Sequence, residues 1–184
     1  MFRCACPRRR RPAEATFMDP FAQTDCSCPC GNSRIAVSGS PVVRFICHCT
    51  ICQTVYRKPF ADIVAVKANQ IATPIDPSVQ VKKYKSPPAL NRGVCSSCSN
   101  PVVAFLPLTP FFGLAFVPSA NFPSGTQLPQ PSVHVFYEKR VADVGDAIHK
   151  VSGFWPSQWG VTSRFVSGLL LPKFQGDFRT GRLR

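Results

Sequence analysis

The sequence predicts a mainly β domain of short antiparallel strands joined by long, proline-rich loops. Its 184 residues suit one compact domain, and an apolar fraction of 45% is ordinary for a globular protein. The 19 prolines and 11 glycines favour turns and irregular connections over long helices. This composition excludes helical bundles and collagen-like repeats.

Short apolar or alternating runs, separated by connections that carry Pro, Gly or Asn, predict the strands. These runs are residues 34–38, 42–46, 60–66, 79–84, 102–106 and 133–137. Because Gly39-Ser40-Pro41 is a turn signal, we expect the first two runs to form a hairpin.

The remaining connections carry little regular structure by this criterion. Residues 107–132 hold six prolines and no helical period, so we expect a long loop or flap that is functional or mobile and not part of the core. Asp143–Lys150 is the only plausible helical turn. The most apolar stretch, Val102–Val117, is too short to span a membrane and is broken by prolines, so no membrane partner is expected.

Most of the formal net charge of +13 lies near the two ends of the chain. Residues 1–25 are rich in Arg, Pro and small residues and predict a disordered basic extension. Met18 lies shortly before the first segment with a strand-like pattern and could itself correspond to a start codon. Residues 1–17 are then interpreted as a targeting extension, as the product of an upstream start or, as we favour, as a dispensable tail. With no secretory signal visible, we expect a cytoplasmic protein, or a mitochondrial one if residues 1–17 act as a transit segment.

Seven of the ten cysteines fall into three groups with chelating spacing, and reduced thiols in these groups favour metal over disulfides. The groups are Cys28-Pro29-Cys30-Gly31, Cys47-His48-Cys49-Thr50-Ile51-Cys52 and Cys95-Ser96-Ser97-Cys98. Cys26, Cys4 and Cys6 are left over, and Cys26 is interpreted as a spare thiol that oxidation could reach.

If the first and third groups pair, Cys28, Cys30, Cys95 and Cys98 form a closed structural zinc site. Cys47, Cys49 and Cys52 then hold a second zinc with an open fourth position, as catalytic zinc requires. The alternative is two closed structural sites, with His48 or His134 as the last ligand. In an extended segment the His48 side chain points away from the flanking thiols, so a core or hydrogen-bonding role is favoured.

These motifs resemble the glutathione-dependent formaldehyde-activating enzymes, a family grouped with centromere protein V. The family shows C-x-C-G, then C-H-C-x-x-C, an aromatic strand, a Tyr-x-Ser element, C-x-x-C and a late His-bearing strand. Here these are residues 28–31, 47–52, 60–66, 84–86, 95–98 and 133–136. The resemblance covers residue 26 to about 146 and implies a zinc-stapled β-tent domain at 26–150.

Two departures from the family pattern stand out. Ser99 replaces the glycine that usually follows the last cysteine, and Ala147–Lys150 replaces a Leu-Pro element. Residues 151–184 are therefore expected to be a divergent tail.

The resemblance implies a carbon–sulfur lyase with two zinc ions that acts on a thiol–aldehyde adduct. Its substrates would be glutathione and formaldehyde, giving S-hydroxymethylglutathione, or a related pair. Arg44, Arg57, Lys58 and Arg92 are candidates to bind substrate carboxylates, with solvated surface charge as the alternative.

The rival function is a non-catalytic zinc module for protein or nucleic-acid partners. Lys82, Lys83 and Lys85 form too small a basic cluster for a nucleic-acid groove, so nucleic acid is not the expected partner.

Overall fold

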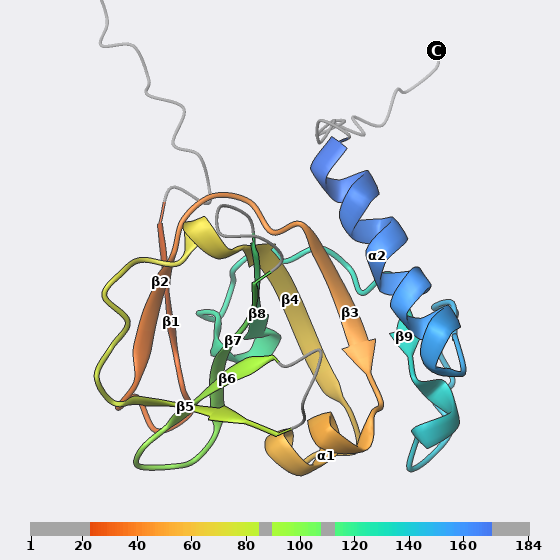
Figure 1. Cartoon of the computed structure of the whole chain (residues 1–184), viewed down its shortest axis with the longest axis horizontal. Helices are drawn as coiled ribbons and strands as arrows, with labels where there is room; N and C mark the ends of the chain where they lie inside the picture. Colours follow the sequence, from red (N-terminus) through yellow and green to blue (C-terminus); the bar gives the residue numbers. More distant parts are fainter. Residues whose placement is uncertain (1–22, 85–89, 108–112, 171–184) are drawn as a thin grey trace, which may run out of the picture.

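The computed structural model describes residues 23–84, 90–107 and 113–170, and within these ranges it confirms the mainly β prediction. A two-stranded sheet pairs β1 (Thr24–Ser27) with β2 (Arg34–Val37). A seven-stranded sheet has the order β5-β6-β7-β8-β4-β3-β9 and is antiparallel except between β3 and β9 (Figure 1). Its strands are β3 (Val43–Cys47), β4 (Ala61–Lys67), β5 (Val79–Lys83), β6 (Asn91–Cys95), β7 (Pro101–Pro107), β8 (Gly113–Pro118) and β9 (His134–Val135). This arrangement is compatible with a β-tent.

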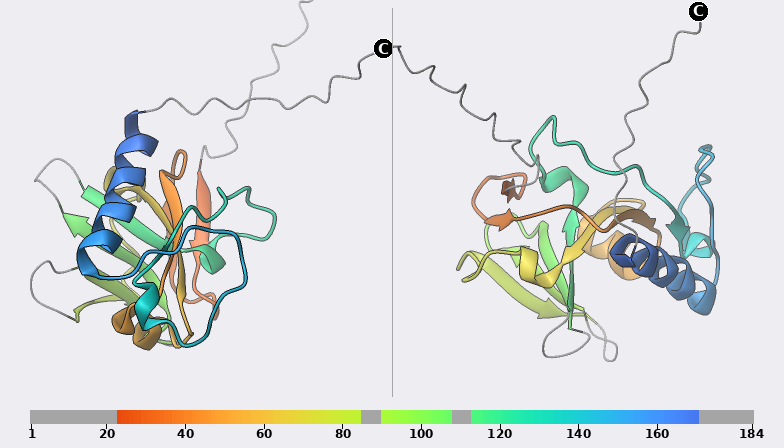
Figure 2. Two further views of the ribbon diagram at one scale, coloured as in Figure 1. Left: turned by 90° about the vertical axis from the view of Figure 1, so that its right-hand side faces the viewer. Right: turned by 90° about the horizontal axis from the view of Figure 1, so that it is seen from above.

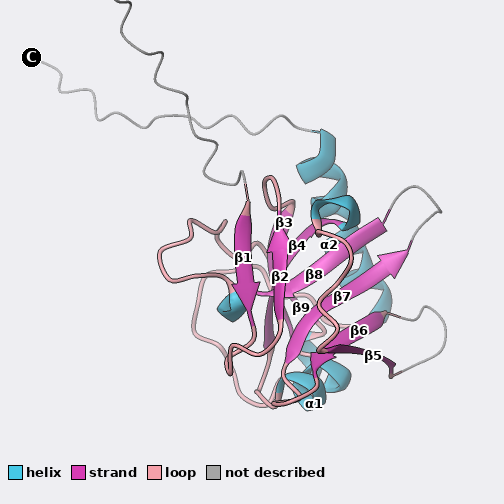
Figure 3. Cartoon of the chain, turned by 90° about the vertical axis from the view of Figure 1, so that its left-hand side faces the viewer, coloured by secondary structure: helices cyan, strands magenta, loops and turns pink. Residues whose placement is uncertain are grey.

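The seven-stranded sheet is covered on both faces. The β1–β2 hairpin lies on one side, and the helix α2 (Phe154–Leu170) packs against β3 and β9 on the other (Figures 2 and 3). The central strands β4 and β8 have nearly continuous apolar sequences, because their side chains point alternately into one core and the other.

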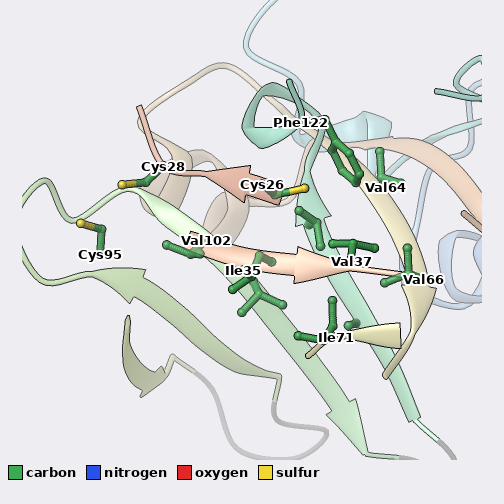
Figure 4. Close-up of a cluster of buried hydrophobic side chains, with 13 residues drawn as sticks. Cys26, Cys28, Ile35, Val37, Val64, Val66, Ile71, Cys95, Val102 and Phe122 are labelled. Carbon is green, nitrogen blue, oxygen red and sulfur yellow. The ribbon is translucent and has the colours of Figure 1, made fainter. Parts of the chain in front are cut away.

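We call these two clusters the hairpin-side core and the helix-side core. The hairpin-side core (Figure 4) consists of Cys26, Cys28, Ile35, Val37, Val64, Val66, Ile71, Cys95, Val102, Val103, Ala115, Val117 and Phe122. The helix-side core consists of Val43, Phe45, Cys47, Cys52, Ala61, Ile63, Ala65, Leu114, Phe116, Val133, Val135 and Phe165. Cys28 and Cys95 thus lie in the hairpin-side core, whereas Cys47 and Cys52 lie in the helix-side core.

The inner face of α2 is shaped for close packing. Phe165 contacts Phe45 and Phe116 with ring centroids 6.3 and 6.0 Å apart. A Cβ at Gly168 would lie 2.6 Å from the carbonyl oxygen of Val42, so only glycine lets the helix approach β3 this closely. Trp155 and Trp159 point outward, 79% and 73% exposed.

The expected hairpin over residues 34–46 is wrong. β2 pairs with β1, whereas β3 pairs with β4 and β9. Gly39 does adopt a left-handed turn with φ 73°, but the chain then leaves the small sheet and enters the large one. The turn signal located a change of direction without specifying the pairing partner.

The expected long loop over residues 107–132 is interrupted by β8 and a short 3-10 helix, Ser119–Asn121. The prolines at 107 and 118 end β7 and β8 and do not break them, since a strand end needs no further ladder donor. Asp143–Lys150 is irregular and not helical. Within the described residues, the helices are instead the 3-10 turns, α1 (Thr50–Tyr56) and α2.

The structure describes only the inner part of each expected end. Thr24 and Asp25 belong to β1, and residues 1–22 lie outside the described residues. Within the expected tail, α2 is part of the folded unit because Phe165 is buried against the sheet. Residues 171–184 lie outside the described residues. No helix in the described part of the chain has the length and hydropathy that a bilayer crossing requires.

Candidate metal centres

Four cysteine thiols converge where the β1–β2 turn meets the β6–β7 turn. The Sγ atoms of Cys28, Cys30, Cys95 and Cys98, here the four-thiol group, lie within 4.8 Å of one another. Cys30 Sγ lies 3.3 Å from Cys28 Sγ and 3.7 Å from Cys95 Sγ. With metal–sulfur bonds of about 2.3 Å, a tetrahedral zinc site has sulfur–sulfur edges of about 3.8 Å. The donor set and spacing therefore fit a closed tetrahedral thiolate site.

Two tight turns hold these thiols. Gly31, with φ 75°, donates its N–H to the Cys28 carbonyl at 2.8 Å, and the buried Ser33 donates its backbone N–H to Cys28 Sγ at 3.3 Å. In the second turn Ser99 has φ 56° and donates its N–H to the Cys95 carbonyl at 2.9 Å. Ser99 thus adopts the left-handed conformation for which glycine is usual, so its departure from the family pattern preserves the turn.

Hydrogen bonding favours a thiolate in this group. Burial raises the pKa of Cys95, but hydrogen bonds from the Ser33 side chain and the backbone of Cys98 and Ser97 outweigh it and lower the pKa to about 5. A pre-ionised thiolate is the form that binds metal.

Three further thiols lie together at the junction of β3 and α1. The Sγ atoms of Cys47, Cys49 and Cys52, here the three-thiol group, also lie within 4.8 Å of one another. Cys47 ends β3, Cys49 caps the N-terminus of α1, and Cys52 lies in the first turn of that helix. Cys47 and Cys52 are buried, and Cys49 is partly exposed, so the group is reachable from one side.

Hydrogen bonds from the Cys47 and Cys52 side chains lower the pKa of Cys49 to about 3, and the Cys52 backbone N–H donates to Cys49 Sγ at 3.4 Å. The same contacts raise the pKa of Cys47, because its thiol is the donor in its hydrogen bond to Cys49. Negative charge therefore concentrates on the partly exposed thiol of the group.

Of the four basic residues that the sequence suggested, Arg92 acts on the three-thiol group. Its charge lowers the pKa of Cys49, and its guanidinium lies 5.9 Å from the ring centre of Tyr84. Arg44 is engaged with Asp62, with Nε 2.8 Å from Oδ1. Arg57 is the left-handed C-cap of α1, and Lys58 is exposed.

His48 is buried and hydrogen-bonded, as the extended geometry predicted. Its Nε2 lies 2.9 Å from His134 Nδ1, and neither histidine belongs to a metal-ligating group in the described part of the chain. The alternative in which one of them completes the second site therefore lacks support. Burial and the facing His134 lower the pKa of His48.

Cys26 is not a thiol that oxidation can reach. It is fully buried in the hairpin-side core, where burial raises its pKa to about 12. It packs there as a small apolar side chain. Cys4 and Cys6 lie outside the described residues.

Two supporting residues escaped the sequence reasoning. Ser33 supports the four-thiol group, and Gln53 donates from Nε2 to the carbonyls of His48 and Lys139, both at 2.7 Å. Ser33 and Gln53 each lie five residues after the residue that they contact, but neither belongs to a motif that marks it. The contact of Gln53 with Lys139 joins residues 86 apart and depends on the folded chain.

Comparison with known proteins agrees with this geometry. The sequence profile of the glutathione-dependent formaldehyde-activating enzymes matches residues 23–139, which is well over half of the chain and includes both thiol groups. A search of the curated proteins finds no match. Seven cysteines in the order that the family shows, gathered into two metal-ligating groups within the matched segment, place this chain in the glutathione-dependent formaldehyde-activating enzyme family.

Proposed function

We propose that the protein is a zinc-dependent carbon–sulfur lyase that acts on the adduct of a thiol and an aldehyde. Glutathione and formaldehyde, giving S-hydroxymethylglutathione, are the substrates that the family name suggests. The observation that carries the proposal is the three-thiol group, which gathers three protein ligands and, within the described residues, no fourth.

In this proposal the chain holds two zinc ions with different roles. Cys28, Cys30, Cys95 and Cys98 would hold a structural zinc, whereas Cys47, Cys49 and Cys52 would hold a catalytic zinc. A zinc ion with three thiolate ligands supplies Lewis acidity at its open position.

The reaction needs no redox cofactor. The thiol sulfur bonds to the carbonyl carbon and the thiol proton passes to the carbonyl oxygen, so one carbon–sulfur bond forms without net oxidation. Arg92 supplies a positive charge beside the three-thiol group that suits a thiol carrying a carboxylate.

Exchange between a thiol and its hemithioacetal, followed by exchange NMR, tests the activity. The zinc-loaded protein should accelerate the exchange, and chelation or Cys52→Ala should abolish the acceleration because both remove the metal site. Cys26→Ala is the matched control, since it removes a buried thiol outside both groups. Acceleration that survives Cys52→Ala contradicts the proposal.

Cobalt substitution separates the lyase from the rival zinc-binding module. A thiol that enters the open position should perturb the d–d bands of one cobalt ion only. If neither glutathione nor any other small thiol perturbs either cobalt, the non-catalytic module becomes the better function. Lys82 and Lys83 do not favour that rival, because exposed lysines on the edge strand β5 also protect a sheet edge against aggregation.

A further inference from the structure

A buried polar chain connects the three-thiol group to the loop before α2. His48, which lies between Cys47 and Cys49, places Nε2 2.9 Å from Nδ1 of His134. His134 Nε2 lies 2.9 Å from Asp146 Oδ2, and Lys150 Nζ donates to Asp146 Oδ1 at 2.8 Å. Both imidazoles are nearly fully buried, whereas Asp146 and Lys150 are partly exposed. The chain thus runs from the protein surface to the metal-ligating segment.

The carboxylate of Asp146 determines the direction of each hydrogen bond in this row of side chains. An ionised carboxylate only accepts hydrogen bonds, and Lys150 and His134 lower the pKa of Asp146 to about 2. His134 therefore donates from Nε2, and in the tautomer that carries this single proton, Nδ1 accepts from His48 Nε2–H. Tyr137 packs edge-on against both rings, with centroids 5.1 Å from His48 and 5.8 Å from His134, and restricts their rotation.

The backbone around His48, like its side chain, is hydrogen-bonded to the segment that contains β9. The His48 N–H donates to the Val135 carbonyl at 3.0 Å, and the Ile46 N–H donates to the Val133 carbonyl at 3.0 Å. β9 therefore supports the segment that carries Cys47 and Cys49. A shift of the His134 ring would be transmitted directly to the residue between two of the three thiols.

The residues that hold His134 from the surface side lie beyond the family match, which ends at residue 139. His134 exchanges two backbone hydrogen bonds with the loop: its N–H donates to the His149 carbonyl at 2.8 Å and its carbonyl accepts from the Val151 N–H at 2.9 Å. Lys150 Nζ also donates to the Asp146 carbonyl at 2.7 Å and holds the loop closed around the carboxylate.

From this geometry we propose that Asp146 is a positioning residue for the three-thiol group, acting through His134 and His48 to hold Cys47 and Cys49 in the metal-binding arrangement. The inference rests on the proposed function only in so far as the three-thiol group binds zinc. Hydrogen-bonded partners of metal ligands typically change metal affinity 10- to 100-fold when removed. Asp146 acts one step further out, through two histidines that are not ligands, so an effect at the lower end, about tenfold, is expected here. Without Asp146 the His134 Nε2–H is left without its acceptor inside the protein, and both rings can reorient.

The test compares the zinc affinities of the two thiol groups in the full chain. Wild type and Asp146→Ala are loaded with zinc and titrated with a chromogenic chelator, with no thiol or aldehyde substrate present. Cys49→Ser identifies the affinity that belongs to the four-thiol group. Asp143→Ala is the matched control, because Asp143 is an exposed carboxylate of the same loop that pairs with Arg140 and contacts neither histidine. Its contact with the packing around the rings is a long hydrogen bond of 3.4 Å from the Tyr137 hydroxyl, which leaves the Tyr137 ring in place when it is removed.

We expect Asp146→Ala to weaken zinc binding at the three-thiol group by about tenfold and to leave the four-thiol group unchanged. Asp146→Glu should restore part of the loss, and Asp143→Ala should match wild type. Equal affinities in wild type and Asp146→Ala, or an equal loss at both groups, overturn the inference. A wild type that binds zinc only at the four-thiol group overturns both the inference and the proposed function, whereas selective weakening in a protein without lyase activity overturns the function alone.

Histidine nitrogen NMR of the zinc-loaded wild type gives a second measurement that does not depend on any variant folding. We expect neutral His134 and His48 each to carry the proton on Nε2. Protonation of either neutral ring at Nδ1 alone overturns the donor order and with it the role of Asp146.

Discussion

The four-thiol and three-thiol groups use the same residue type in opposite ways. The four-thiol group joins turns that are 65 residues apart between Cys30 and Cys95, and it borders the hairpin-side core. The three-thiol group comes from one six-residue stretch, Cys47–Cys52, and borders the helix-side core. A crosslink between distant segments removes much more freedom from the unfolded chain than a local one does. We therefore expect the four-thiol group to stabilise the fold and the three-thiol group to depend on the fold for its position.

Their neighbouring strands reinforce this difference. The two-stranded β1–β2 sheet has only four paired positions, and an isolated pair of strands is marginal in water. The three-thiol group instead ends β3, which is paired on both sides by β4 and β9. Loss of metal should consequently affect the two groups unequally.

The largest expected effect is that of Cys98→Ser. Metal binding at a closed thiolate site contributes folding free energy directly, on the order of 10 kcal/mol for zinc, which is comparable to the whole stability of a domain. We expect the variant to lose its cooperative melting transition in circular dichroism. Ser97→Ala, which changes an exposed side chain of the same turn, should melt like wild type. A normal transition in Cys98→Ser would contradict a staple role for the four-thiol group.

Cys49→Ser should have the next largest effect, because it removes one metal and the lyase activity but not the fold. Serine is a good N-cap, so its hydroxyl can replace Cys49 Sγ as the acceptor for the Cys52 N–H. We expect melting within a few degrees of wild type, one zinc in place of two by metal analysis, and no thiol exchange activity. If Cys49→Ser unfolds the protein as badly as Cys98→Ser does, the division into structural and catalytic groups is wrong.

The same contrast explains what the sequence could predict. Chelate spacing within Cys47–Cys52 or Cys95–Cys98 is local, so those groupings follow from strand and turn geometry alone. Most strands were also visible, because period-two patterns with bounding prolines and glycines are local signals. The turn at Gly39 was visible too, but its pairing partner was not, since pairing depends on surfaces far along the chain.

Elements stabilised mainly by tertiary contacts were missed. β8 lies between proline-rich segments. Its residues from Leu114 to Val117 are all buried and point alternately into the two cores, so no alternation of polar and apolar residues marks the strand. α2 contains Gly160 and Gly168, which lower helix propensity, and the missing side chain at Gly168 allows close packing beside β3. The contact of Asp146 with His134 is of the same kind, because neither residue signals the other in the sequence.

A smaller effect is expected for Phe165→Ala, which tests the helix-side core without touching a ligand. Phe165 is 7% exposed and packs on Phe45 and Phe116, so its loss should cost about 3 to 5 kcal/mol of unfolding free energy in denaturant titration. Val166→Ala is the control: Val166 is 48% exposed, and its change should stay within about 0.5 kcal/mol. Both variants should retain two zinc ions. Equal costs for the two variants would show that α2 does not pack on the sheet through Phe165.

The smallest effect is expected for Cys26→Ala, which asks whether the four-thiol group needs a fifth cysteine. Cys26 is fully buried among apolar side chains of the hairpin-side core, so alanine removes one small apolar group at a cost of roughly 1 kcal/mol. Cys26→Ser has nearly the same size but buries a hydroxyl, so it should cost about 1 to 3 kcal/mol more wherever that hydroxyl finds no partner. Chemical denaturation should therefore rank serine below alanine, with two zinc ions bound in both. The reverse ranking, or a zinc lost from Cys26→Ala, would show that Cys26 contributes a polar or ligating sulfur and that the staple is not confined to the four thiols assigned to it.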